Sequence, residues 1–137
     1  MKILAFVDLH GKVNLLDKLK KKAEECDIVV CAGDLTVFEN QMRSLISTIA
    51  SFGKPVLMIH GNHEDEVNME RSCEGLLNVH FLDKKTFELN GRIFLGYGGG
   101  GFAVKELEFE KISEQFAKSA KKAKKTILVT HGPPFGT

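Results

Sequence analysis

Short apolar runs, each followed at once by polar residues, are the feature that most constrains the fold of this chain. The runs occupy residues 3–7, 27–32, 56–59 and 126–130. A short continuous apolar run bounded by turn residues is typical of a strand buried on both faces, as in a parallel sheet. We therefore expect four buried strands whose ends meet at the same edge of the same sheet.

Helical periodicity fills the intervals between these runs. Leu15, Leu19 and Ala23 recur every four residues and predict an amphipathic helix over residues 14–25. A second helix is predicted over 42–49, and a third over 106–124. Their apolar faces are formed by Met42, Leu45, Ile46 and Ile49, and by Leu107, Ile112, Phe116, Ala120 and Ala123.

The middle of the chain has the pattern of antiparallel structure. Asn90-Gly91 separates two strand-like segments, 86–89 and 92–96, and this dipeptide predicts a hairpin. Residues 79–82 predict another short strand. The order is βαβαβ, then antiparallel β, then αβ, so we expect residues 1–137 to form a single α/β domain.

Composition narrows the functional class. The 137 residues carry 19 Lys and Arg against 18 Asp and Glu, a net charge of +1. That balance argues against a dedicated nucleic-acid-binding module or a membrane-surface binder. No apolar run approaches the ~20 residues of a membrane span. The three cysteines, Cys26, Cys31 and Cys73, follow no ligand spacing and predict reduced thiols in a cytoplasmic protein.

Side chains able to bind metal follow each of the four apolar runs. They are Asp8, His10, Asp34, Asn62, His63 and His131. Each has an ordinary explanation on its own, such as a helix cap, a turn residue or a hydrogen-bonded histidine. Together they favour a metal site, because the carboxyl ends of parallel strands converge at one sheet edge. His60 and His80 lie outside this pattern, and we expect both to be structural.

The donor types indicate which metals suit the site. Carboxylate, imidazole and amide groups without thiolate favour Mn, Fe, Zn or Co over a structural thiolate-bound zinc. Asp8 and His10 lie two residues apart, on the same side of an extended segment, so both can bind one ion. Asp34 has two oxygens and can bridge to a second ion.

Four motifs in this order resemble those of the calcineurin-like metallophosphoesterases. They are Asp8-Leu9-His10, Gly33-Asp34, Gly61-Asn62-His63-Glu64 and Thr130-His131-Gly132, and the resemblance spans residues 2–135. The phrase His131-Gly132-Pro133-Pro134 is most similar to small, stand-alone prokaryotic members. The resemblance implies a four-layer αββα sandwich with a two-metal centre at the strand ends.

The same resemblance implies a role for each residue. Asp8 and His10 bind the first metal, Asp34 bridges both, and Asn62 and His131 bind the second. His63 is not a ligand but the general acid, and Asn62 also touches the substrate phosphate. The implied reaction is hydrolysis of a phosphodiester or phosphomonoester by a metal-bridging hydroxide, with His63 protonating the leaving group.

The chain departs from the family pattern in one respect. The family has a further motif, G-H-x-H, whose histidines each complete one metal, and no such motif occurs in this sequence. The last strands of the second sheet are expected to be missing too. We expect this to reflect a fragment of a longer protein, rather than a naturally incomplete site or one completed by a second chain. Weaker metal binding, with activity reduced or lost, and self-association through exposed apolar sheet are then expected.

Two other functional classes compete with this reading. Residues 96–101 fit G-x-G-x-x-G, the dinucleotide-binding pattern, but no acidic residue follows the next strand to bind a ribose. A loop beside the active-site edge explains these glycines better. A non-catalytic scaffold on the phosphoesterase fold is the stronger alternative. Such proteins often lack the general-acid histidine, whereas this chain has His63. We expect a small phosphate-ester substrate, since no recognition domain is appended.

Overall fold

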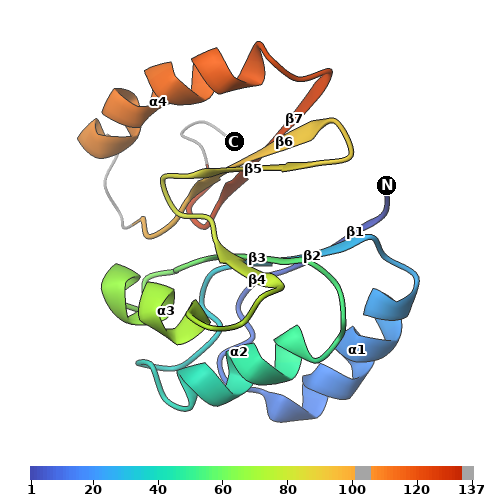
Figure 1. Ribbon diagram of the computed structural model, residues 1–137. Coiled ribbons are helices and arrows are strands. Elements are labelled where there is room, and N and C mark those ends of the chain that lie inside the picture. The colour runs from blue at the N-terminus through green and yellow to red at the C-terminus, as the bar shows by residue number, and fades with distance from the viewer. Residues whose placement is uncertain (101–105, 134–137) are drawn as a thin grey trace.

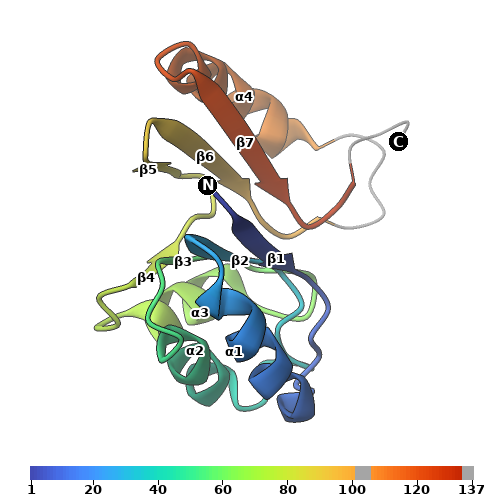
Figure 2. The ribbon, with the colours of Figure 1, turned by 90° about the vertical axis from the view of Figure 1, so that its right-hand side faces the viewer.

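The chain folds into four layers, helices on sheet on sheet on helix (Figure 1). The computed structural model describes residues 1–100 and 106–133. Helices α1 (Leu16–Glu24), α2 (Met42–Ala50) and α3 (Glu66–Cys73) cover one face of the first sheet. Helix α4 (Leu107–Ala120) covers the outer face of the second sheet, as Figure 2 shows from the side. The predicted αββα sandwich is confirmed.

The first sheet is parallel throughout. Its strands are β1 (Ile3–Phe6), β2 (Ile28–Ala32), β3 (Val56–Ile59) and β4 (Val79–Phe81), in that spatial order. The register pairs Phe6 with Cys31, and Ala32 with Ile59. The carboxyl ends of β1, β2 and β3 therefore lie side by side, and the segments that follow them leave the sheet at one edge.

The second sheet mixes antiparallel and parallel pairing. Strands β5 (Thr86–Leu89) and β6 (Arg92–Tyr97) form the predicted hairpin, and β7 (Lys125–Thr130) pairs parallel to β6. The expectation that residues 126–130 share a sheet with the first three strands is wrong. An apolar run marks a strand but says nothing about its partner, and Thr130 pairs with Tyr97 of the second sheet.

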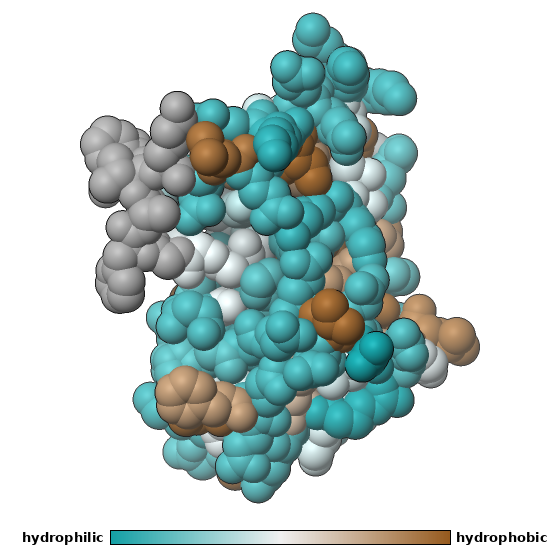
Figure 3. All heavy atoms as spheres, turned by 90° about the vertical axis from the view of Figure 1, so that its left-hand side faces the viewer, coloured by the Kyte–Doolittle hydropathy of each residue, from teal (hydrophilic) through white to brown (hydrophobic). Residues whose placement is uncertain are grey.

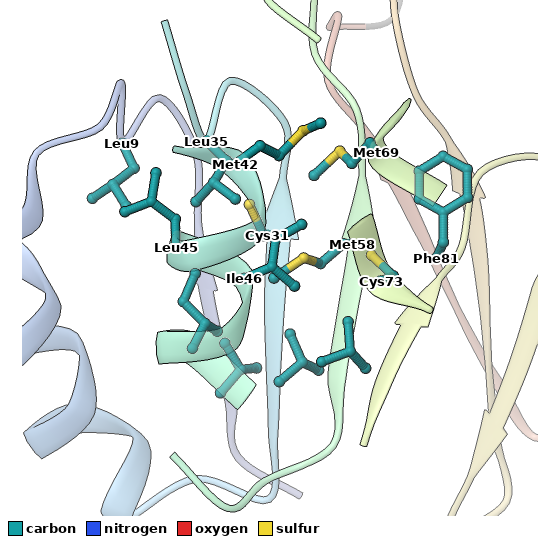
Figure 4. Close-up of a cluster of buried hydrophobic side chains, with 14 of the residues drawn as sticks. Leu9, Cys31, Leu35, Met42, Leu45, Ile46, Met58, Met69, Cys73 and Phe81 are labelled. Carbon is teal, nitrogen blue, oxygen red and sulfur yellow. The ribbon is translucent and has the colours of Figure 1, made fainter. Parts of the chain in front are cut away.

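Side-chain alternation along the strands builds three separate cores. In β2, Val29 and Cys31 face helices α1–α3, whereas Ile28 and Val30 face the second sheet. The first of these cores is shown in Figure 4, where Leu45 and Ile46 of α2 lie over Cys31. In β6, Phe94 enters the layer between the sheets, and its neighbours Ile93 and Leu95 pack toward α4. Because successive side chains of a strand point to opposite faces of the sheet, a strand that is covered on both faces contributes to two cores.

Two predicted buried strands are edge strands instead. Ile3 of β1 is 38% exposed and Leu128 of β7 is 45% exposed. Each strand ends its sheet in the described part of the chain, so one side of it has no covering neighbour. The prediction that these two strands are buried is therefore wrong.

The helices also differ from prediction at their ends. Residues Val13–Leu15 form a 3₁₀ turn before α1, and Leu16 rather than Leu15 enters the core. Leu107, predicted on the apolar face of the last helix, is exposed at its first turn. Helix α3 was not predicted, because only Met69 and Cys73 along it are buried. No helix in residues 1–100 and 106–133 is long and apolar enough to cross a membrane.

Candidate metal centre

The segment after β1 is bonded directly to the segment after β2. The Asp8 amide donates to the Gly33 carbonyl (3.2 Å), and the His10 amide donates to the Asp34 carbonyl (3.0 Å). These backbone bonds continue the sheet pairing beyond the ends of the strands. They place the side chains of Asp8 and His10 beside that of Asp34.

Asp34 lies at the centre of the cluster and is buried. Its Oδ2 is 3.9 Å from Nε2 of His10 and 3.9 Å from Nε2 of His63. Its Oδ1 is 3.6 Å from Nε2 of His131. The two oxygens of one carboxylate therefore face different histidines, and Asp8 lies between them, its Oδ1 4.0 Å from Nε2 of His10. Two overlapping groups of side chains share Asp34. These groups are His10, Asp34 and His63, and Asp8, Asp34 and His131, each with ligand atoms within 4.8 Å of one another.

His131 reaches the cluster from the other sheet. It follows β7, and its ring Nδ1 lies 2.9 Å from the carbonyl oxygen of Ala32 at the end of β2. Its Nε2 lies 3.1 Å from Oδ1 of Asn62, which follows β3. The structure thus brings together all six side chains that the sequence places after strand ends, but from both sheets rather than one.

The histidine tautomers suit metal binding. A carbonyl oxygen only accepts, so Nδ1 of His131 donates its proton to Ala32. In this tautomer the lone pair of Nε2 faces two further acceptors, Oδ1 of Asn62 and Oδ1 of Asp34, an arrangement of electron-rich atoms that suits a cation between them. His10 has the same arrangement, with Nδ1 3.4 Å from the Thr36 carbonyl and Nε2 4.0 Å from Oδ1 of Asp8. Metal-ligating histidines commonly use this arrangement, which fixes the ring and directs the free nitrogen at the ion.

Close backbone packing makes two glycines necessary here. A Cβ on Gly61 would lie 2.0 Å from Oδ1 of Asp34, and a Cβ on Gly33 would lie 2.6 Å from Nδ1 of His131. Asp8, His10 and Asp34 themselves adopt positive φ angles of 56°, 46° and 51°. Non-glycine residues rarely adopt this conformation, and strain of this kind clusters at functional sites.

Glu64 organises the loops around the cluster, a role that the sequence did not predict. Its Oε2 accepts hydrogen bonds from the amides of Asp34 (3.1 Å) and Gly61 (2.9 Å). Its Oε1 accepts from the amide (2.8 Å) and the hydroxyl (2.9 Å) of Thr36. One buried carboxylate therefore ties the segment after β2 to the segment after β3. An acidic residue following Gly-Asn-His was visible in the sequence, but its partners appear only in the fold.

The position of His63 is compatible with two roles, that of a metal ligand and that of a general acid. Its ring lies 5.0 Å from that of His10 and 4.9 Å from that of Phe38, centroid to centroid. Its Nδ1 is buried and has no hydrogen-bond partner among the described residues. Because its Nε2 lies as close to Asp34 as that of His10 does, the distances alone allow it to be a ligand as well as an acid.

A second cluster of polar side chains lies beside this one, and its carboxylates are already paired with a histidine and a lysine of the chain. His60 contacts Asp83 (Nε2 to Oδ2, 3.6 Å) and bonds the Gly61 carbonyl. The Lys84 ammonium binds Glu66 (2.7 Å) and Glu108 (3.2 Å), and lies 3.7 Å from Asp83. Burial opposes charge on Asp83, but the nearby imidazole of His60 and the hydrogen bond from the Gly98 amide outweigh it and lower the Asp83 pKa. His60, Glu66 and Asp83 have metal-ligand types, yet the lysine makes this a structural network.

The remaining histidine and the cysteines have structural surroundings. His80 packs on Phe87, ring centroids 4.5 Å apart, and burial lowers its pKa. Cys31 and Cys73 are buried, which raises the pKa of each thiol to about 12. Inert thiols of this kind fit a packing role.

The donor set of the main cluster fits metal binding. Imidazole nitrogens with free lone pairs, carboxylate oxygens and an amide oxygen converge on a partly exposed volume at the edge of the sheets. Neighbouring ligands around one ion at ~2.1 Å are roughly 3–3.5 Å apart, so the observed separations need only small shifts. The fold and this cluster define a class: layered α/β proteins that hold metal at the ends of their strands.

Comparison with known proteins identifies the family within that class. The family model described as calcineurin-like phosphoesterase matches residues 1–137, and the chain belongs to this family. The family is metal-dependent and its members hydrolyse phosphoesters. A search of curated proteins finds no match.

Solved structures share the fold. One crystal structure has a TM-score of 0.77 at 20% identity, covering 98% of this chain and 70% of its own. The crystal structure of TT1561 of Thermus thermophilus has a TM-score of 0.79 at 13% identity, covering 97% of this chain and 72% of its own. At these identities the likeness concerns the fold alone.

Proposed function

We propose that this protein hydrolyses a phosphodiester or phosphomonoester with two divalent transition-metal ions, Mn, Fe, Zn or Co. The observation that carries the proposal is the placement of Asp34, whose two carboxylate oxygens face different histidines. A carboxylate in that position can bridge two ions. Asp8 and His10 would hold one ion, and Asn62 and His131 the other.

The protein's own groups supply binding and proton transfer. When bound, the metals would lower the pKa of an attacking water and neutralise charge on the phosphate. His63, half-buried beside Asp34, gives its proton to the leaving oxygen as the phosphorus–oxygen bond breaks. The exposed amide of Asn62 donates a hydrogen bond to a phosphate oxygen. Glu64 keeps the loops that carry Asp34 and His63 in register.

The proposal extends to partners and compartment. The protein acts on a small phosphate ester in the cytoplasm. It has no membrane partner and no dedicated nucleic-acid module in this proposal. The exposed Ile3 and Leu128 on the edge strands of the two sheets support self-association through uncovered sheet. Edge strands with apolar side chains are common sites of pairing between chains.

Turnover of bis-p-nitrophenyl phosphate at saturating Mn²⁺ tests the function. Saturating metal is needed because the sequence contains no G-H-x-H motif to complete the coordination of the ions. We expect release of p-nitrophenol by the wild type and by Asp17→Asn, an exposed control on α1, and none by Asp34→Asn. Saturated binding of two metals without turnover in the wild type would favour the scaffold alternative, because the missing G-H-x-H ligands would then not explain the inactivity.

A further inference from the structure

Phe38 is an exposed aromatic residue held against His63. Its side chain is 79% exposed, and its ring centroid lies 4.9 Å from that of His63 with the planes tilted by 41°. Single exposed apolar residues are common on protein surfaces and need no explanation by themselves. What sets Phe38 apart is its position beside the proposed acid and the way its loop is built.

The loop holds Phe38 in an unfavourable backbone conformation. Phe38 and Glu39 have φ angles of 47° and 64°, in the left-handed region that bulky residues rarely occupy. The Glu39 amide donates to Oγ1 of Thr36 (3.1 Å), which in turn donates to Glu64. The Glu39 carboxylate accepts from the Asp65 amide (2.7 Å) and from Nδ2 of Asn68 (3.0 Å) at the start of α3. The loop is therefore fastened to the segment that carries His63.

We propose that Phe38 determines specificity by stacking on a planar ring in the leaving group of the substrate. This inference rests on the proposed function, in which His63 protonates the leaving oxygen. Proton transfer requires that oxygen within about 3 Å of His63, so the organic group attached to it lies within reach of the Phe38 ring. A ring held in water at that point has an open face for a second ring.

The surroundings favour recognition of one ring rather than a large apolar group. The Phe38 loop is bonded through Glu39 to the start of α3. Figure 3 shows the side of the molecule on which α3 lies, and most of that surface is hydrophilic, with hydrophobic groups standing apart. Stacking of a base or aryl ring on an aromatic side chain typically changes affinity by about tenfold when the side chain is removed. The preferred leaving group is thus a phenol or a nucleoside, and not glycerol or another aliphatic alcohol.

Binding of two phosphonates to the Mn²⁺-loaded chain tests the inference without turnover. Phenylphosphonate and methylphosphonate share the anionic group and differ in the ring. By calorimetry, the wild type should bind phenylphosphonate about tenfold more tightly, and Phe38→Ala should abolish that preference. Phe38→Tyr should retain it, and Val37→Ala, on the same loop and also exposed, should leave it unchanged. Because Phe38 is exposed, the thermal midpoint of Phe38→Ala should match the wild type.

The outcomes separate this inference from the function on which it rests. An equal preference in the wild type and Phe38→Ala would overturn the role of Phe38 and leave the phosphoesterase proposal standing. Failure of both phosphonates to bind the wild type would overturn both. The source of the ring is distinguished by kcat/KM for diesters releasing p-nitrophenol, adenosine or glycerol. Phe38→Ala should lower kcat/KM about tenfold for the diester that releases p-nitrophenol or for the one that releases adenosine, and change it less than about twofold for the one that releases glycerol. An equal loss of kcat/KM on all three diesters would contradict stacking.

Discussion

Glu64 accepts four hydrogen bonds from groups on two loops, and it is buried. A carboxylate is suited to this position because each of its oxygens accepts two donors. The sequence showed an acidic residue after Gly61-Asn62-His63, yet nothing in the sequence identified Thr36, Asp34 and Gly61 as its partners. Residues whose function depends on contacts between distant loops are those that sequence patterns miss.

Glu64→Gln should loosen these loops. An amide nitrogen cannot accept, so two of the four donors would face another donor, and we expect a loss of about 2 kcal/mol in the free energy of unfolding. Metal affinity should fall as well, since the Asp34 amide is one of the donors. Urea titration and metal titration measure the two effects, with exposed Glu114→Gln as the matched control. Unchanged stability and affinity would show that the four bonds do not organise the site.

His63→Ala separates the acid from the ligand role. If His63 only protonates the leaving group, the variant should lose about 10²–10⁴-fold in kcat while its metal content is unchanged. Metal analysis after dialysis measures the metal content, and turnover of a diester that releases an alkoxide, which unlike p-nitrophenolate needs a proton to leave, measures the loss in kcat. His80→Gln, which alters a histidine packed on Phe87, serves as control. Equal loss of metal and rate would assign His63 to the ligands.

At the scale of the elements, the loops at the carboxyl ends of the strands position the site. Periodicity predicted most helices and strands, because alternating burial is a local property of the sequence. It missed α3, which has only two buried side chains, and it assigned β7 to the wrong sheet. Strand partners depend on contacts between segments far apart in the chain, which a local pattern does not contain. The side chains of the cluster could still be named from the sequence, since strands of both sheets end near the same edge.

Gly61→Ala should disrupt the approach of the loop after β3 to the end of β2. The added Cβ would meet Oδ1 and the backbone nitrogen of Asp34, so the loop must move away. We expect at least tenfold weaker metal binding, measured by isothermal titration. Gly53→Ala is a suitable comparison because its Cβ would meet nothing within 4 Å, although its φ of 72° makes it mildly strained. Similar metal binding in both variants would argue against this packing constraint.

Asp83→Asn should destabilise the junction between β3, the β4–β5 turn and α3. The Asp83 pKa is lowered in the folded state, so its contribution to stability is present above its ordinary value near 3.8 and is lost as the pH falls through the folded value. At pH 7 we expect a loss of about 3 kcal/mol, because His60 and Lys84 lose a charged partner. Denaturation at several pH values should show the difference from the wild type shrinking below pH ~4. A difference independent of pH would exclude the ionic contribution.

At the scale of the whole molecule, the two sheets meet so that donors from both reach one place. Asp8, His10, Asp34 and Asn62 follow strands of the first sheet, and His131 follows a strand of the second. The packing of Ile28, Val30 and Phe94 between the sheets holds these halves together. A metal bound across them would bind only the folded state and would therefore raise its stability by mass action.

The central claim is that Asp34 and the side chains around it bind metal. Equilibrium dialysis of the whole chain against Mn²⁺ or Zn²⁺, followed by metal analysis, tests it most directly. The account predicts saturable binding of two ions per chain in the wild type and in Asp17→Asn, and loss of both ions in Asp34→Asn. Equal binding by Asp34→Asn and the wild type, or no saturable binding by the wild type, would contradict it.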